Sequence, residues 1–319
     1  MVPIERAIFI ISMGKKASKT KVVERFVYSA RKIGKFLGWI VVLTDAPPGR
    51  YNNMLRWAWA DKVIIMEPKE EDLKTRYKIS NMVYKRFKTF ALEYMGRDPR
   101  LDQVQLVYYL DSDIVFGDNL IQAFNGLETT YGIGPYGGTA NSTSLRRGKM
   151  WMFRGNIFSK YAQGSWPLQG GQIILDRYLS QPCLERWRRG FDQEDTKEVG
   201  KDQFLLLDIT AEMDRERNLT LHQSISSNKT ALQCEIVIME QAPYIEFPSV
   251  EEIKIRSKNL REKRGYRYDY SPIVHVKNDG GTKDLRESEI RPFMKDILQF
   301  KDNQRDYLGI LEKVQMDTT

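Results

Sequence analysis

The first 116 residues alternate between short apolar runs and amphipathic segments, and this alternation is the strongest constraint on the fold. The apolar runs span residues 7–12, 39–43, 60–66 and 105–110. Between them, residues 20–37 and 77–94 carry apolar side chains at helical spacing, and Gly38 is placed to end the first helix. Strands that are apolar on both faces and alternate with helices are typical of a parallel sheet covered on both sides. We therefore predict an α/β fold with a Rossmann-like, mostly parallel central sheet flanked by helices.

Beyond residue 116 the pattern becomes irregular. Further strands are expected at 170–175, 234–239 and 273–276, with a short helix at 182–189. Residues 284–319 are expected to form a polar, helical extension. The pattern indicates one domain over 1–283, with an ordered half at 1–116 and an irregular half at 117–283 that shapes a site.

Composition excludes several classes of protein. The 319 residues include only two cysteines, Cys183 and Cys234, which exclude a disulfide scaffold and a cysteine-based zinc site. The two histidines, His222 and His275, exclude a multi-histidine metal site. No apolar run approaches the roughly 18 residues of a membrane span, and no signal peptide is visible. The 50 Lys+Arg residues exceed the 42 Asp+Glu residues and give a net charge of +8, which favours an anionic partner.

Two carboxylates follow the fourth apolar run directly. Asp111 and Asp113 come after the buried run at 106–110. In an extended chain, side chains two residues apart point to the same side, and open α/β sheets bind ligands at the carboxyl ends of their strands. Two carboxylates there suit Mg²⁺ or Mn²⁺, which would connect them to a diphosphate. The alternative is a turn with two solvated aspartates, because Asp-x-Asp alone is a weak signal.

Two classes of enzyme use such a pair. In phosphatases of the haloacid-dehalogenase type, Asp111 would be the nucleophile and Asp113 the general acid. That motif follows the first strand of its domain, whereas three strands and two long helices come first here, and no downstream acidic metal pair is evident. Nucleotide-sugar glycosyltransferases carry the pair after the fourth strand of a Rossmann-like half, which fits the position observed.

Three later motifs make a resemblance specific. They are Leu168-Gln169-Gly170-Gly171, Lys201-Asp202-Gln203 and His275-Val-Lys-Asn-Asp-Gly280-Gly281-Thr-Lys283. With Asp111-x-Asp113, their order and spacing over about residues 7–283 resemble glycosyltransferases of the GT-A fold, closest to glycosyltransferase family 8, the glycogenin and bacterial galactosyltransferase type. The chain departs from that pattern at Gln169, where the family has Asn, and in the last motif, which is two residues longer. The resemblance is therefore to a remote relative.

The resemblance implies a metal site and a nucleotide site. His275 would complete the metal site with Asp111 and Asp113, because neutral imidazole can join carboxylates around Mn²⁺; a core or surface histidine is the alternative. A uracil and a ribose would lie near Ser12 and Thr44, where the first two strands end.

The same resemblance assigns groups to the diphosphate. Gly280 and Gly281 would let the backbone approach phosphate closely. Lys283 would neutralise the departing diphosphate, where negative charge develops in the transition state. Lys85, on the second long helix, lies where the family carries a basic residue that contacts the donor. Each lysine has the alternative of a solvated surface position.

On the sugar side, Gln169, Asp202 and Gln203 would orient the donor, and Gly170 and Gly171 would leave room for its ring. A tight turn or bulge is the alternative for the two glycines, and a helix N-cap for Asp202.

Two further segments are rich in aromatic residues. Trp151, Phe153, Tyr161 and Trp166 can form an acceptor platform, because aromatic rings stack on sugar faces, although core packing is the default for each. Basic residues interleave with tyrosines at 255–270, a composition that can bind single-stranded nucleic acid, but no recognition motif accompanies it, so nucleic acid is not favoured.

The expected function is metal-dependent transfer of a sugar from a nucleotide-diphosphate sugar, most simply a UDP-sugar, to an acceptor that the sequence does not identify, with retention of anomeric configuration. The nucleotide-binding half is 1–116 and the acceptor and sugar-binding half is 117–283. The alternatives are the phosphatase and a non-catalytic carbohydrate- or nucleic-acid-binding protein. The compartment is cytoplasmic by default, with a secretory or Golgi lumen as the alternative, because Asn141, Asn218 and Asn228 begin glycosylation sequons.

Overall fold

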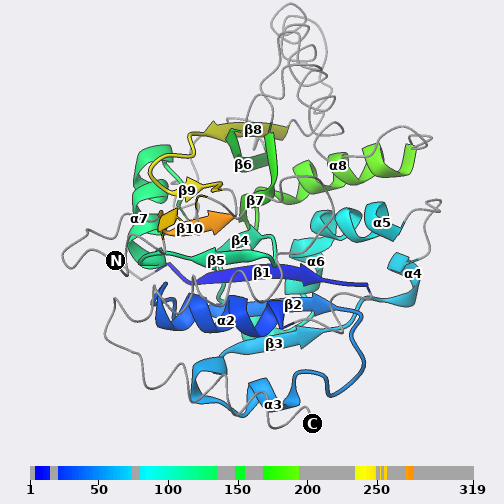
Figure 1. Ribbon diagram of the computed structural model, residues 1–319. Coiled ribbons are helices and arrows are strands. Elements are labelled where there is room, and N and C mark those ends of the chain that lie inside the picture. The colour runs from blue at the N-terminus through cyan, green and yellow to red at the C-terminus, as the bar shows by residue number, and fades with distance from the viewer. Residues whose placement is uncertain are drawn as a thin grey trace, which may run out of the picture.

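A large mixed sheet organises the protein (Figure 1). The computed structural model describes residues 4–14, 21–73, 80–134, 148–154, 168–193, 234–248, 252, 255–256 and 271–275. Within these ranges, a seven-stranded sheet has the order β3-β2-β1-β4-β7-β6-β8 and a three-stranded sheet has the order β5-β10-β9. The strands are β1 (Arg6–Ser12), β2 (Trp39–Thr44), β3 (Val63–Met66), β4 (Leu106–Leu110), β5 (Ile114–Phe116), β6 (Gly148–Arg154), β7 (Leu168–Asp176), β8 (Cys234–Met239), β9 (Ile245–Glu246) and β10 (Ile273–His275).

Strand directions divide the large sheet into two parts. β3, β2, β1 and β4 are all parallel to one another. β7 runs antiparallel to both β4 and β6, and β8 is parallel to β6. The mostly parallel α/β sheet expected from the sequence is confirmed.

Helices cover both faces of this sheet. They are α2 (Val22–Lys32), α3 (Asn52–Leu55), α4 (Glu70–Leu73), α5 (Ser80–Arg86), α6 (Ala91–Met95), α7 (Leu120–Tyr131) and α8 (Gln181–Gln193), with short 3₁₀ turns η1 (Ala58–Ala60), η2 (Phe87–Phe90) and η3 (Pro99–Leu101). Side chains alternate along β1, so Ile8 packs in one core with Phe26 of α2, and Phe9 packs in the other with Trp187 of α8. None of the described helices has the length and apolar character needed to span a membrane.

The first predicted helix is shorter than expected. It ends at Lys32, where the backbone N–H groups of Ile33 and Gly34 both donate to the carbonyl oxygen of Ser29. Gly38 therefore does not end the helix. A Cβ atom at Gly38 would collide with the ring of Phe36 at 2.6 Å, so this glycine lets the chain pass close to its neighbours before β2 begins.

The second predicted helix, at 77–94, is interrupted. Its described part consists of α5, η2 and α6, and all four residues of η2 are buried. A 3₁₀ turn has three residues per turn rather than 3.6, so it rotates the side chains that follow it relative to a continuous α-helix. The interruption turns a lysine, Lys88, toward the protein interior, where it is 7% exposed.

Four elements after β4 were not predicted from the sequence, because each is short or lacks a clear period: β5, α7, β6 and β9. The predicted strands at 170–175, 234–239 and 273–276 and the helix at 182–189 correspond to β7, β8, β10 and α8. The predicted extension at 284–319 lies outside the described residues, and the domain boundaries stay a prediction.

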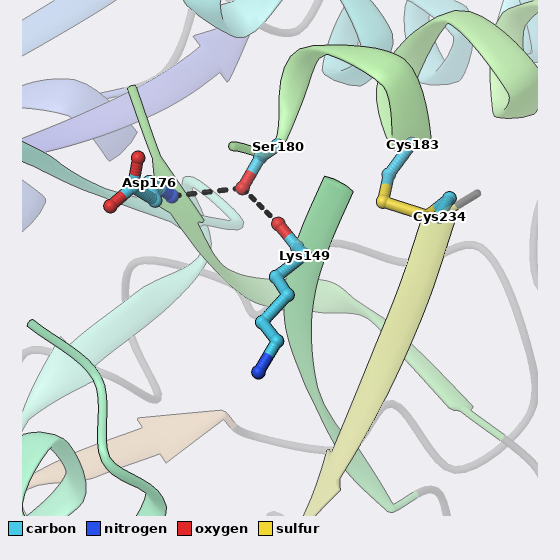
Figure 2. The surroundings of a disulfide bond; sticks show 5 residues. All are labelled: Lys149, Asp176, Ser180, Cys183 and Cys234. Carbon is cyan, nitrogen blue, oxygen red and sulfur yellow. Dashed lines mark hydrogen bonds between the residues drawn. A yellow bond between two sulfur atoms is a disulfide. The ribbon is translucent and has the colours of Figure 1, made fainter. Parts of the chain in front are cut away.

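A disulfide joins the two cysteines (Figure 2). Cys183 near the start of α8 and Cys234 at the start of β8 are both buried and bonded, with their Cα atoms 5.1 Å apart. Nearby, the Ser180 hydroxyl accepts a hydrogen bond from the backbone N–H of Asp176 and donates one to the carbonyl oxygen of Lys149. The bond therefore ties β8, the last strand in the sheet order, to the helix that covers the sheet.

We predict that removing the disulfide lowers stability substantially. The bond closes a loop with a sequence separation of 51 residues, for which the chain-entropy model gives about 4 kcal/mol. Cys183→Ser/Cys234→Ser, or reduction, should lower Tm by several degrees, measured by thermal unfolding with and without dithiothreitol. Two free thiols in the native, unreduced protein, or an unchanged Tm, would contradict this.

Candidate functional site

Two segments far apart in the chain bring two carboxylates and one imidazole together. Asp111 follows β4, Asp113 precedes β5, and His275 ends β10. One ligand atom from each lies within 4.8 Å of the others. The antiparallel pairing of β10 with β5 places His275 opposite Ile114, next to Asp113. The pairing within the three-stranded sheet therefore places His275 beside the turn that follows β4 of the seven-stranded sheet.

A tight turn, rather than an extended strand, holds the acidic pair. The backbone N–H of Ile114 donates to the carbonyl oxygen of Asp111 at 3.2 Å. We expected an extended chain to direct both carboxylates to the same side, and this is wrong, because the chain turns at these residues. The turn still gathers them, because it reverses the chain between β4 and β5.

Asp113 and His275 stabilise each other's charge. Their atoms Oδ1 and Nε2 lie 3.4 Å apart. Desolvation acts against the charge on Asp113, but the positive charge and hydrogen bond of His275 outweigh it, so the pKa of Asp113 is lowered. Desolvation likewise acts against protonated His275, but the charge and hydrogen bond of Asp113, with the charge of Asp111, raise the pKa of His275.

Asp111 is held from its other side. The hydroxyl of Tyr109 donates to its Oδ1 atom at 2.7 Å. The ammonium of Lys88 lies 3.6 Å from the same oxygen and donates to the carbonyl oxygen of Gly170 at 2.7 Å. One buried cation thus links the acidic turn to β7, and it also lies 5.3 Å from the centre of the Tyr109 ring.

From the sequence, Lys88 is only one of the basic neighbours of Lys85, with a solvated face as the default, whereas the structure buries it beside Asp111. Lys85, the predicted donor contact, lies in α5 and is partly buried, and its role stays a prediction. The signal for Lys88 was its position between Phe87 and Phe90 in an apolar stretch, because a lysine on the buried side of a helix needs an acidic partner.

Gly171 explains how closely Asp111 can approach the sheet. Its carbonyl oxygen accepts a hydrogen bond from the backbone N–H of Asp111 at 2.8 Å. A Cβ atom at Gly171 would lie 2.9 Å from Cγ of Asp111 and 3.5 Å from Cε1 of His275. The absence of a side chain is therefore needed for the carboxylate to occupy its place.

The residues present fit a divalent cation. Two carboxylates and an imidazole form a donor set that suits Mn²⁺, or Mg²⁺ with added oxygen ligands. The side chain of Asp113 is 54% exposed, that of Asp111 28% and that of His275 19%. A cation held here would therefore have protein on one side and an approach for a substrate on the other.

Ser12 and Thr44 lie side by side at the carboxyl ends of β1 and β2, where they are paired and buried. Burial raises the pKa of Tyr51, and hydrogen bonds with Thr44 and Ser12 act in the opposite direction. Asp45, the next residue, accepts from the backbone N–H of Gly14 at 2.8 Å. The loop after β1 is thus fastened to the end of β2, and its role in binding a nucleotide stays a prediction.

Several predicted residues fall outside the described part of the chain. These are Asp202, Gln203, Gly280, Gly281, Lys283, the three sequon asparagines, and Tyr161 and Trp166. Gln169 and Gly170 lie at the start of β7. Trp151 and Phe153 of β6 are 3% and 2% exposed, which makes them core residues.

Comparisons with known proteins add little beyond this geometry. No family model matches the chain, and no curated protein does. Two solved structures of the glycosyltransferase GlyE from Streptococcus pneumoniae TIGR4, one of them the apo form, align with 96% of this chain, at 11% and 12% identity and TM-scores of 0.47 and 0.48. The chain spans 64% of the length of each. Because these identities and TM-scores are low, the proposed function rests on the side chains of the site.

Substituting Gly171 should weaken cation binding. In Gly171→Ala the added Cβ must displace the Asp111 carboxylate, so we expect the Kd for Mn²⁺ to rise about tenfold or more, measured by calorimetry. Gly134→Ala is the matched control, because a Cβ there meets nothing within 4 Å. Equal affinities in the two variants would contradict the role assigned to Gly171.

Proposed function

We propose that this protein is a metal-dependent glycosyltransferase that uses a nucleotide-diphosphate sugar, with a UDP-sugar as the first donor to test. The single observation that carries this proposal is the cluster of Asp111, Asp113 and His275 at the carboxyl end of a parallel strand. Ligands of open α/β sheets bind at that edge. Hard oxygen donors with one imidazole are suited to a cation that binds a diphosphate.

Each described residue has a defined task in this proposal. Asp111, Asp113 and His275 would hold Mn²⁺ or Mg²⁺, which when bound neutralises the charge that develops on the departing nucleotide diphosphate. Lys88 offsets the charge of the acidic turn and keeps Asp111 against β7. Because Lys88 is buried and held by Gly170, it acts on the carboxylate rather than on a distant phosphate.

The remaining assignments follow from the family resemblance. Lys283 and Lys85 would stabilise the departing diphosphate. Gln169, Asp202 and Gln203 would orient the donor sugar. Retention of configuration is part of the same proposal, as is transfer of a hexose. The acceptor is a carbohydrate, a protein or a lipid-linked group.

We also propose an oxidising compartment. Disulfides persist in secreted, lumenal or periplasmic proteins and are rare in the cytosol. The buried bond between Cys183 and Cys234 therefore favours the secretory alternative over the cytoplasmic default, in agreement with the sequons at Asn141, Asn218 and Asn228.

The decisive experiment measures donor use. Purified protein is screened with a panel of nucleotide sugars with and without Mn²⁺, and both melting temperature and nucleotide release are recorded. A donor that binds only the folded state raises Tm. We expect a UDP-sugar to raise Tm more with Mn²⁺ and to be hydrolysed or transferred.

Asp113→Asn should reduce this metal-dependent release by about a hundredfold or more, because it removes a charged ligand without changing the volume of the side chain. The control is Asp102→Asn, which alters an exposed ion pair with Arg177 and should leave activity unchanged. Unchanged release in Asp113→Asn would overturn the metal assignment.

The other functions give different results in the same assay. Mg²⁺-dependent hydrolysis of simple phosphomonoesters, without use of nucleotide sugars, would indicate the phosphatase. Sugar binding without turnover would indicate a non-catalytic carbohydrate-binding protein. Salt-dependent oligonucleotide binding would indicate the nucleic-acid alternative.

A further inference from the structure

Gln172 makes a contact that the proposed chemistry does not yet explain. It lies in β7, opposite Leu110 of β4, and is 0% exposed. Its side-chain Nε2 atom lies 2.8 Å from Nδ1 of His275. Glutamine is an unusual choice for a fully buried strand position, because an amide loses its hydrogen bonds to water there.

The two ring nitrogens of His275 have different neighbours. Nδ1 faces the amide of Gln172, whereas Nε2 faces Asp113 at 3.4 Å. Phe247 packs beside the same ring, with the ring centres 5.5 Å apart. The nitrogen directed at the acidic pair is therefore Nε2, and the amide contacts the opposite end of the ring.

The amide can support either tautomer of the imidazole. With Nε2 of Gln172 as donor, Nδ1 of His275 accepts, and a neutral ring carries its proton on Nε2, toward Asp113. With the amide rotated by half a turn, Oε1 accepts from Nδ1–H, and the lone pair of the histidine Nε2 is directed at the acidic pair. Only the second arrangement allows His275 to bind a cation, because a ligating nitrogen must not carry a proton.

Among the described residues, one end of the Gln172 amide has no hydrogen-bond partner in the placed orientation. Within the described part of the chain, the Oε1 atom of Gln172 is buried and has no hydrogen-bond partner. In the placed orientation the amide therefore leaves a buried acceptor unpaired among these residues, and rotating it by half a turn lets Oε1 accept from Nδ1–H of His275.

We propose that Gln172 is a positioning residue for His275: its carboxamide oxygen accepts the Nδ1–H hydrogen bond and so aims the Nε2 lone pair at Asp111 and Asp113. This inference rests on the proposed metal site. Hydrogen bonds of this kind, from the far ring nitrogen of a metal-bound histidine, orient the ring and change metal affinity about 10- to 100-fold when lost.

The same contact sets metal preference. Imidazole nitrogen is a better ligand for Mn²⁺ than for Mg²⁺, which prefers oxygen and retains water. Losing the correct tautomer of His275 should therefore weaken Mn²⁺ binding more than Mg²⁺ binding. A general loss of structure would weaken both alike.

The test uses the full chain and three substitutions of Gln172. Gln172→Met keeps a side chain of similar length that cannot accept the hydrogen bond in the same way, and Gln172→Leu removes the polar group entirely. Gln172→Glu keeps an acceptor for Nδ1–H and is the rescue variant. The Kd values for Mn²⁺ and Mg²⁺ are measured by calorimetry, and thermal unfolding is used to select variants that remain folded.

We expect the Kd for Mn²⁺ to rise about 10- to 100-fold in Gln172→Met and Gln172→Leu, with a smaller change for Mg²⁺. Gln172→Glu should retain the Mn²⁺ affinity of the unsubstituted protein. An unchanged ratio of Mn²⁺ to Mg²⁺ affinity in a folded Met or Leu variant would overturn the proposal.

A second readout does not depend on activity or on the folding of the Gln172 variants. Nitrogen-15 spectra of histidine-labelled protein report which ring nitrogen carries the proton, and His222→Gln assigns the His275 signals, because the chain has two histidines. With Mg²⁺ bound, we expect the proton on Nδ1. A proton on Nε2 would overturn the role of Gln172, whereas failure of the unsubstituted protein to bind either cation would overturn the metal site itself.

Discussion

The hydrogen bond from the backbone N–H of Asp111 to the carbonyl oxygen of Gly171 is the contact on which the site depends. It ends the antiparallel pairing of β7 with β4 at the point where β4 becomes the acidic turn. Because β7 runs against β4, its first residues lie beside the last residues of β4. Gly170, Gly171 and Gln172 therefore lie beside the acidic turn, where they contact Lys88, Asp111 and His275, respectively.

Concentrating two carboxylates in one turn has an electrostatic cost, and the structure offsets it from two directions. Lys88 approaches Asp111 from the helical layer, and His275 approaches Asp113 from the small sheet. Lys88 forms its ion pair with Asp111, and His275 forms its ion pair with Asp113. The side chain of Asp113 is also partly exposed to solvent. In the proposed metal site, a divalent cation would take the place of the His275 proton as the positive charge beside the two carboxylates.

Much of the fold could be predicted because its signals are local. Apolar runs that are buried on both faces predicted β1, β2 and β4, and the alternation with amphipathic helices predicted a parallel sheet. The pattern failed where the determinants are not local. The 3₁₀ turn that buries Lys88 interrupts a segment of good helical periodicity, and β5 has only three residues, Ile114–Phe116, too few to show a period. The disulfide was also missed, because two cysteines 51 positions apart carry no information about whether they meet.

By itself, the sequence determined that Asp111 and Asp113 would follow a buried parallel strand, since local hydrophobicity decides burial and the motif is contiguous. It also supplied a candidate third ligand in His275, through the order of its motifs. Only the tertiary structure decided that this histidine meets the pair and that Lys88 and Gln172 contact the site. The physical reason is that these contacts join strands and helices far apart in the chain, and the pairing of β7 with β4 and of β10 with β5 is set by packing over the whole sheet.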